Sequence, residues 1–361
     1  MAVCRPHPRK SRRGTSLWHA LVRAVVCMAL LALLCACEPR VDTPVAAPTP
    51  QRHPDAAQGF PLHMRDALGS ATLEALPQRV VTLGLGADDI AVSLGVVPVG
   101  TGRADWGGDA DHYWPWVREA IERTGQPLPA VIAMQPELDI EAIVALRPDV
   151  VLAPFSGMSP QAYVQLSAMV PVVAYPDRPY LTPVNQQMDL IARALGRSAQ
   201  ADALKTRVRN ALQASAVRHP EWQGKRFAYV RADPASGNFT VYVAGDPRVD
   251  TLRGMGLELA PVIADWQASP GKFAHYLGFE HASALSEVDV VISWFYNADE
   301  RDRVARMPLF AAIPAVQRGA YVALTDSALV MASSSGTPLA VDWMLERLAV
   351  PLSMAARRSQ P

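Results

Sequence analysis

Apolar positions recur every three or four residues along 198–219, which predicts one long amphipathic helix. Ser198 is a suitable N-cap, and Pro220 ends the helix because proline cannot continue the backbone hydrogen-bond ladder. At about 1.5 Å per residue the helix is about 30 Å long, close to the diameter of a small domain. Its apolar face consists of Ala201, Leu204, Val208, Ala211 and Leu212.

A shorter amphipathic helix is predicted at 183–195, and the two helices lie between segments of similar pattern. Each segment reads as a strand, a helix, a strand, and a short helix that begins with glutamate and runs into an Asp-Val-Val strand. The matching parts are 79–83, 88–94, Glu141 and 149–151 in the first segment, and 226–230, 247–255, Glu280 and 289–291 in the second. Strand–helix alternation makes any α/β domain look self-similar, so the matched glutamates and Asp-Val-Val runs carry the interpretation. The sequence predicts an α/β fold of two Rossmann-like lobes bridged by a single long α-helix.

The length of 361 residues suffices for two domains of ordinary size, and half of the residues are apolar. The N-terminal lobe is expected to open with a hairpin that turns near Gly69. We expect a signal segment at 1–36, a proline-rich tether at 37–59, an N-terminal lobe at 60–180, linking helices at 181–220 and a C-terminal lobe at 221–361.

Charge and cysteine placement exclude several classes of protein. The formal net charge is zero with both signs interspersed, so nothing indicates a nucleic-acid-binding surface. The cysteines are Cys4, Cys27, Cys35 and Cys37. Their early positions exclude a disulfide framework, a cysteine-based zinc site and a cysteine nucleophile from the folded body. The histidines are scattered and the sequence lacks a Gly-x-Ser-x-Gly elbow, so neither an enzyme nor a metal site is predicted.

An apolar run at 24–36 follows an arginine-rich start, as in a signal segment, and is too short for a comfortable membrane span. It ends in Leu34-Cys35-Ala36-Cys37, which resembles a bacterial lipobox with Cys37 as the lipid-modified residue. A single-pass anchor and a secreted protein without lipid are the alternatives. The prolines that follow predict an extended tether of up to roughly 60 Å. Neither inner versus outer membrane nor Sec versus twin-arginine export can be read from this pattern.

An ordered series of motifs carries a family resemblance. They are PQRVVTLG at 77–84, LGVVPVG at 94–100, YWPWV at 113–117, EAIVALRPDVVL at 141–152 and IPAV at 313–316. This series resembles the siderophore-binding proteins of bacterial iron ABC importers, a family similar to the ferric-hydroxamate, ferric-enterobactin and vitamin B12 binding proteins. The resemblance covers about 60–352 and includes two α/β lobes joined by one long helix.

The resemblance implies a non-enzymatic, monomeric binding protein in the periplasm or cell envelope, anchored to a membrane by lipid at Cys37. It implies that the protein captures a ferric siderophore between the lobes and delivers it to the permease dimer of an ABC importer. Iron enters only as part of the siderophore, so no cofactor is expected. The hydroxamate-binding relatives place an arginine before the segment that corresponds to Glu137, where this chain has Met134-Gln135, which leaves the siderophore class open.

A ferric siderophore site needs flat aromatic walls and arginine donors, because the ligand is bulky, often anionic and rich in oxygen. Such residues follow predicted strands or lie in the loop before Glu280, and each has core packing as its alternative role. Trp114, Trp116 and Trp343 are interpreted as interior residues. The candidate ligand-binding residues are Arg103, Trp106, Phe155, Ser156, Arg231, Tyr276, Trp294 and Tyr296.

Glu141 and Glu280 occupy equivalent places in the two halves, each near the start of a short helix. Favourable interaction with the helix N-terminus is one explanation. The resemblance implies instead that one glutamate per lobe contacts arginine on the permease. The ligand alternatives are haem, for which Tyr276 or His275 could serve as axial ligand, and cobalamin. The run Ser333-Ser334-Ser335-Gly336 is interpreted as a cap of the last helix, expected at 338–348.

Overall fold

The structure is a computed structural model that describes residues 59–269 and 272–359. The predicted signal segment, Cys37 and all of the predicted tether except its last residue lie outside the described residues. The described chain opens with the predicted hairpin, in which β1 (Leu62–Arg65) pairs antiparallel with β2 (Ser70–Leu73). The Asp66 carboxylate closes the turn by accepting a hydrogen bond from the backbone N–H of Gly69 (2.7 Å).

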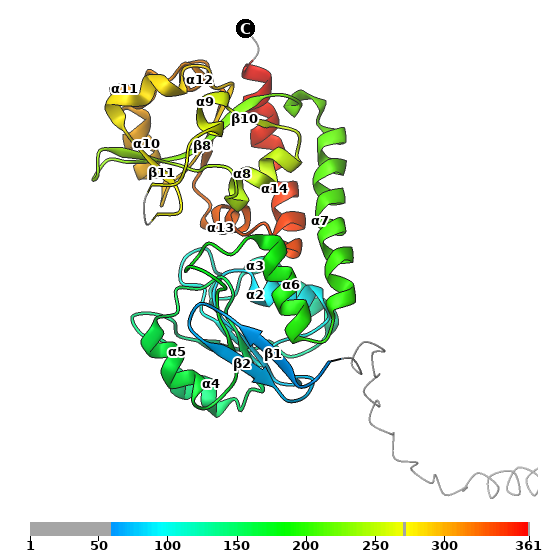
Figure 1. Cartoon of the computed structure of the whole chain (residues 1–361). Coiled ribbons are helices and arrows are strands. Elements are labelled where there is room, and N and C mark those ends of the chain that lie inside the picture. Colours follow the sequence, from blue (N-terminus) through cyan, green and yellow to red (C-terminus); the bar gives the residue numbers. More distant parts are fainter. Residues whose placement is uncertain (1–58, 270–271, 360–361) are drawn as a thin grey trace, which may run out of the picture. The chain divides into compact units, whose positions relative to one another are not determined.

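A five-stranded parallel sheet forms the centre of the N-terminal lobe, with the strand order β5-β4-β3-β6-β7 (Figure 1). The central strands β3 and β6 are buried throughout, as expected of parallel strands covered on both faces. The strands are β3 (Val80–Thr82), β4 (Gly100–Gly102), β5 (Ala130–Ile132), β6 (Val150–Leu152) and β7 (Val172–Val173). The helices around them are α2 (Ala87–Ser93), α3 (Pro115–Thr124), α4 (Ile140–Ala145) and α5 (Pro160–Ser167).

A mixed sheet of order β11-β9-β8-β12-β13 forms the C-terminal lobe, and the short β10 also pairs with β8. The long strand β8 is parallel to β12 and antiparallel to β9. The strands are β8 (Arg226–Asp233), β9 (Asn238–Val241), β10 (Glu258–Leu259), β11 (His275–Gly278), β12 (Val290–Trp294) and β13 (Tyr321–Leu324). The helical segments are η2 (Pro220–Trp222), α8 (Pro247–Gly254), α9 (Pro261–Ala264), η3 (Phe279–Leu285), α10 (Ala298–Ala305), α11 (Pro308–Ala311), α12 (Pro314–Gln317) and α13 (Ser327–Ser335).

The predicted linking helices are confirmed as α6 (Val184–Ala194) and α7 (Ser198–Arg218), and α7 runs from one lobe to the other (Figure 1). Leu204 of α7 packs in the core of the N-terminal lobe, whereas Leu212 packs in a core that the C-terminal lobe shares. The predicted N-cap at Ser198 is wrong, because the cap position is Arg197 and no side chain caps this end.

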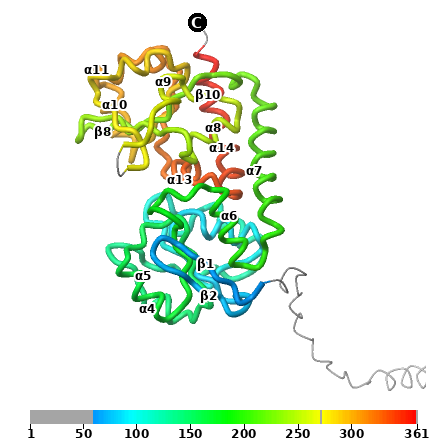
Figure 2. Tube along the Cα trace, in the orientation of Figure 1, coloured from blue at the N-terminus to red at the C-terminus, as the bar shows by residue number. Residues whose placement is uncertain are grey.

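A second helix of 21 residues, α14 (Pro338–Arg358), lies beside α7 (Figures 1 and 2). The predicted end at residue 348 is wrong, because the helix continues through Pro351. Leu348 and Leu352 are buried on either side of this proline, so packing of the apolar face holds the helix together where one backbone hydrogen bond is lost. Within residues 59–269 and 272–359, no helix is both long and apolar enough to span a bilayer.

The largest apolar core crosses the boundary between the lobes. Trp116 of α3 stacks on Trp114 with ring centroids 5.4 Å apart and lies 5.7 Å from Trp343 of α14. Trp114 and Trp116 are buried, as predicted, and Trp343 is partly buried against them. Further members of this core are Val117, Ile121, Met344 and Leu348. Because α14 packs on α2 and α3 as well as on α7, it joins the lobes a second time.

The start of α14 is capped from the opposite lobe. Asp89 of α2 accepts hydrogen bonds from the backbone N–H of Leu339 (3.0 Å) and of Ala340 (2.9 Å). The Thr337 hydroxyl donates to the same carboxylate (2.6 Å). The predicted capping role of 333–336 is therefore wrong, because these serines form the last turn of α13 and a left-handed glycine ends it.

The internal repeat has a structural cause. Asp149 accepts hydrogen bonds from the backbone N–H of Gln78 (2.7 Å) and Arg79 (2.8 Å), where β3 begins beside β6. Asp289 accepts from the backbone N–H of Arg226 (2.8 Å), where β8 begins beside β12. In both lobes the aspartate of the Asp-Val-Val run therefore ties together the starts of two neighbouring central strands.

Candidate functional site

A cavity of about 580 Å³ lies between the two lobes. Loops after β3 and β6 supply its wall in the N-terminal lobe, at the carboxyl ends of parallel strands, where open α/β sheets bind ligands. The segment before α6 and parts of the C-terminal lobe complete the wall. The main lining side chains are Leu85, Phe155, Tyr180, Arg248, Trp266 and Phe273.

Arg248 is the charged side chain most deeply set in this wall. It stands in the first turn of α8, where Asp246 caps the helix by accepting from the Arg248 backbone N–H (2.9 Å). The same carboxylate pairs with Nη1 of the guanidinium at 3.0 Å, and the guanidinium carbon lies 4.2 Å from the Tyr242 ring centroid. Burial raises the pKa of the Asp246 carboxyl, while the positive charge of Arg248 opposes this rise. The Arg248 side chain is thus held by a carboxylate and an aromatic ring.

The Nε–H group of Arg248 has no hydrogen-bond partner in the described part of the chain. Leaving such a buried donor unpaired costs about 1–3 kcal/mol, and more for a charged group. An oxygen-bearing ligand in the adjoining cavity would supply the missing acceptor. Arg248 is therefore the residue best placed to recognise an oxygen-rich ligand.

Tyr242 connects this wall to a cluster of aromatic side chains. Its hydroxyl accepts a hydrogen bond from Nε1 of Trp294 (2.9 Å), and its ring stacks with Phe273 at 6.3 Å. Trp294 lies 5.4 Å from Trp106 and 5.4 Å from Tyr296, and Trp106 lies 5.6 Å from Tyr296. Trp106 belongs to the N-terminal lobe and the others to the C-terminal lobe, so the cluster spans the boundary beside the cavity.

Arg231 joins the same cluster, with its guanidinium carbon 4.9 Å from the Trp294 ring and 5.0 Å from the Tyr296 ring. Its predicted position after a strand is wrong, because it lies inside β8. The guanidinium pairs with Glu300 (3.2 Å) and Asp233 (3.6 Å). These carboxylates compensate its charge, so the structure brings four predicted residues together as a lobe-to-lobe contact rather than as cavity lining.

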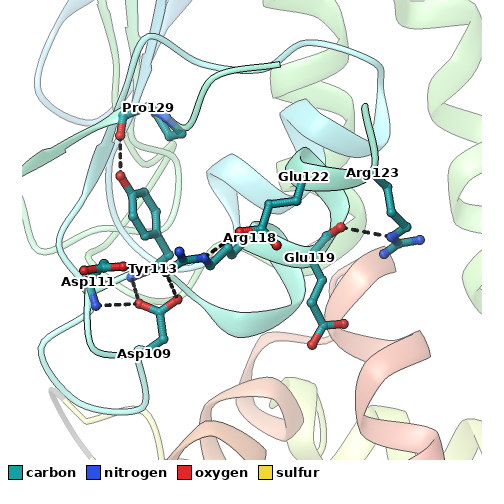
Figure 3. A network of polar contacts seen from close by, with 8 residues as sticks. All are labelled: Asp109, Asp111, Tyr113, Arg118, Glu119, Glu122, Arg123 and Pro129. Atoms are coloured by element: carbon teal, nitrogen blue, oxygen red, sulfur yellow. Dashed lines mark hydrogen bonds and ion pairs between the residues drawn. The ribbon is translucent and has the colours of Figure 1, made fainter. Parts of the chain in front are cut away.

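A network of polar contacts holds the loop that carries Trp106 (Figure 3). Arg118 of α3 pairs with Asp109 (3.0 Å), Asp111 (2.7 Å) and Glu122 (2.8 Å). The Tyr113 hydroxyl donates to the Pro129 carbonyl (2.7 Å). These contacts tie both ends of the loop to the lobe and fix the position of the ring.

Gly107 allows the same loop to approach the C-terminal lobe. Its φ is 88°, and a Cβ at this position would lie 2.7 Å from the carbonyl oxygen of Ser327. Only glycine therefore fits where the loop meets the first residue of α13. The close approach brings Trp106 to the lobe boundary.

The remaining candidates are distributed over other surfaces. Phe155 lines the inter-lobe cavity, whereas Ser156 lines a neighbouring cavity of about 340 Å³ in the N-terminal lobe. Arg103 pairs with Asp105 (2.6 Å) on the exposed loop and lines neither cavity. Tyr276 was expected in a loop, but it is an exposed residue of β11, also outside both cavities.

Sequence reasoning missed Arg248, Tyr242, Tyr180 and Trp266. Arg248 could have been found, because Asp246-Pro247 is a helix-start signal directly after a strand, where ligands gather. Tyr242 and Trp266 carry no signal that separates them from core aromatics. Tyr180 lies in a linking stretch whose direction only the fold defines.

Both candidate docking glutamates are exposed. Glu141 stands in the first turn of α4, but the cap of this helix is Asp139, which accepts from the backbone N–H of Ala142 (2.9 Å). Glu280 lies in η3 with its side chain 71% exposed and its Oε1 3.5 Å from Nε2 of His281. Contact with a permease remains a prediction for both.

No group of three or more His, Cys, Asp or Glu side chains that could hold a metal occurs within residues 59–269 and 272–359. His275 is turned away from the inter-lobe cavity, with Nδ1 3.1 Å from the Gln267 carbonyl and its ring 4.6 Å from Trp266. The predicted axial role for His275 or Tyr276 therefore has no support in this geometry.

Residues 80–328 match the family described as periplasmic binding protein, and the chain belongs to this family. It is 26% identical over 273 residues to the Fe(3+) dicitrate-binding periplasmic protein FecB of Escherichia coli, covering 75% of this chain and 84% of FecB. It is 30% identical over 186 residues to a cobalamin-binding protein of Halobacterium salinarum, covering 50% of this chain and 47% of that protein.

Among solved structures, the fold is similar to that of PiaA from Streptococcus pneumoniae TIGR4 in complex with ferrichrome. The TM-score is 0.74 at 28% identity, covering 82% of this chain and 99% of that chain. The predicted two-lobe α/β fold and the predicted family are thus confirmed. These relatives are binding proteins, and two of them are named for ferric ligands or are bound to one.

Proposed function

We propose that this protein captures a ferric siderophore between its lobes and delivers it to an ABC importer. The observation that carries the proposal is the inter-lobe cavity of about 580 Å³, with aromatic walls and an arginine whose Nε–H lacks an acceptor. The relatives named for Fe(3+) dicitrate and solved with ferrichrome support the ligand class.

The chemistry of a ferric siderophore suits this wall. The siderophore saturates the coordination sphere of iron, so the protein needs no metal ligands of its own. The ligand presents oxygen atoms to the guanidinium of Arg248, which offers directed and charge-assisted hydrogen bonds. Phe155 and Phe273 offer flat apolar surfaces from opposite lobes. Binding would thereby engage both lobes at once.

Delivery rests on Glu141 and Glu280, which are exposed in different lobes. We propose that each meets an arginine of one subunit of a permease dimer. Lipid attachment at Cys37 would keep the protein at the membrane surface that carries the importer. Cofactors play no part in this scheme.

Cobalamin is the second candidate ligand, because one relative is a cobalamin-binding protein. Haem has less support, since neither His275 nor Tyr276 lines the cavity.

The test is a titration of the purified protein with ferric hydroxamate, catecholate and carboxylate siderophores, haem and cobalamin, followed by tryptophan fluorescence. Sub-micromolar quenching by one ferric siderophore class alone supports the proposal. Quenching by cobalamin alone replaces the ligand, and a protein that responds to none of these compounds contradicts the proposal.

A further inference from the structure

Tyr180 separates two cavities of the cleft. Its side chain lines both the inter-lobe cavity of about 580 Å³ and the cavity of about 340 Å³ in the N-terminal lobe. The segment after β6 forms the base of the division, with Phe155 on the inter-lobe side and Ser156 and Gly157 on the other side. The two cavities are therefore neighbours with one aromatic ring between them.

The ring is placed by a small set of contacts. It meets Phe155 edge-on at a centroid distance of 5.9 Å. It also lies directly over Gly157, where an added Cβ would come within 2.7 Å of Cε2 and Cζ of Tyr180. Any side chain larger than hydrogen at position 157 would thus displace the ring from the division.

The backbone of Tyr180 is strained. Its φ is 58°, in the left-handed region that a bulky side chain rarely adopts, and its side chain is exposed rather than packed in a core. Strain of this kind costs about 1–3 kcal/mol and persists where the surrounding structure imposes it, commonly at ligand sites. A ring that is strained at its backbone and exposed at its side chain is able to turn out of the cleft at small energetic cost.

The two cavities differ in chemistry. The inter-lobe cavity is walled by aromatic rings and Arg248, whereas the smaller cavity is lined by amides and hydroxyls. The polar side chains of the smaller cavity include Gln135, Ser159, Gln161 and Gln165. Neutral donors and acceptors of this kind suit the polar periphery of a large chelate rather than its charged centre.

We propose that Tyr180 is the residue that sets the size of chelate that the cleft accepts. With the ring over Gly157, the cleft holds a compact chelate in the inter-lobe cavity. With the ring turned out, the two cavities join and admit a chelate with an extended polar periphery. This inference rests on the proposed function and concerns the same site.

The experiment compares Tyr180→Ala and Gly157→Ala with Tyr180→Phe, which keeps the ring. Dissociation constants are measured for two pairs of chelates that share donor chemistry but differ in size. They are ferric acetohydroxamate with ferrichrome, and ferric dicitrate with ferric staphyloferrin B. In a pair that the wild type binds, both alanine variants should shift the preference toward the larger member by roughly tenfold, within the range that one steric contact supplies. Tyr180→Phe should leave the preference unchanged.

An unchanged preference in both alanine variants overturns the inference while leaving the proposed function intact. A wild-type protein that binds none of the chelates contradicts the proposed function instead. A crystal structure of the Gly157→Ala protein without ligand tests the division by itself. It should show the ring displaced and the two cavities joined, and a ring still between two separate cavities contradicts the inference.

Discussion

The carboxylate of Asp89 in the N-terminal lobe accepts a hydrogen bond from the backbone N–H of Ala340 in the C-terminal lobe, at 2.9 Å. The two residues are 251 positions apart in the chain. The contact places a negative charge at the N-terminus of α14, where the helix dipole favours it. It also fixes α2 to α14 inside the boundary between the lobes, so the lobes are held by a polar contact as well as by α7.

Replacing Asp89 with alanine should lower the free energy of unfolding by about 1–3 kcal/mol, because the first turn of α14 then loses its buried acceptor. The measurement is urea unfolding followed by circular dichroism. The matched control is Asp139→Ala, which removes an exposed cap within one lobe and should have a smaller effect. Equal losses in the two variants would contradict the special role of the contact between the lobes.

Asp88 makes stability depend on pH. It is buried beside Asp89, and this burial, with the neighbouring negative charge, raises the pKa of Asp88 to about 7 from an ordinary value of 3.8. The folded state therefore holds its proton more tightly than the unfolded state does. The stabilisation from this group is complete below about pH 4 and is lost as the pH rises through about 7.

The Asp88→Asn variant should therefore lose less stability than the wild type as the pH rises from about 4 to about 7. Unfolding free energies measured across this range for both proteins check the prediction. Comparing the two proteins removes the contributions of all other titrating groups. Parallel curves would show that the Asp88 carboxyl titrates alike in the folded and unfolded states.

Trp106 and Trp294 should be energetically coupled across the lobe boundary, because their rings lie 5.4 Å apart. A double-mutant cycle with Trp106→Ala and Trp294→Ala should give a coupling free energy of about 0.5–1.5 kcal/mol. The matched cycle combines Trp106→Ala with Phe310→Ala, a core residue of the C-terminal lobe that packs in a separate cluster. Additive losses in the first cycle would mean that the aromatic cluster does not connect the lobes.

Glu141→Arg and Glu280→Arg together should abolish iron uptake in cells that depend on this protein, because both proposed contacts with permease arginines become repulsive. Ligand affinity of the purified variant should stay unchanged. The control reverses two exposed glutamates, Glu74 and Glu346, and should leave uptake intact. Loss of ligand binding in the first variant, or normal uptake, would contradict the docking role.

The sequence was sufficient for the fold because its main signals are local. The period of α7, the Asp-Val-Val runs and the hairpin around Gly69 each depend on neighbouring residues, and the structure confirms them. The cap of α14 escaped prediction because its acceptor, Asp89, comes from a distant part of the chain. The continuation of α14 through Pro351 was missed for a similar reason, since tertiary packing outweighs the local signal of proline.

The site was less predictable than the fold. Position after a strand correctly indicated which loops approach the lobe boundary, as Trp106 and Phe155 show. It could not indicate which side chains fill the boundary themselves and which leave a cavity. Arg231 and Arg248 follow the same sequence logic, yet Glu300 and Asp233 compensate the first, whereas the Nε of the second faces no acceptor. That difference depends on partners brought together only by the fold.

The most direct test of the central claim is the dissociation constant of the Arg248→Gln protein for the ferric siderophore that the wild type binds most tightly. Isothermal titration calorimetry should show affinity weakened by roughly 10- to 100-fold, the loss expected when a charge-assisted hydrogen bond of about 1.5–3 kcal/mol is removed. Arg253→Gln, an exposed arginine of the same helix that lies outside the inter-lobe cavity, is the control and should bind like the wild type. Unchanged affinity in the Arg248→Gln protein would show that the ligand does not bind in the inter-lobe cavity beside Arg248.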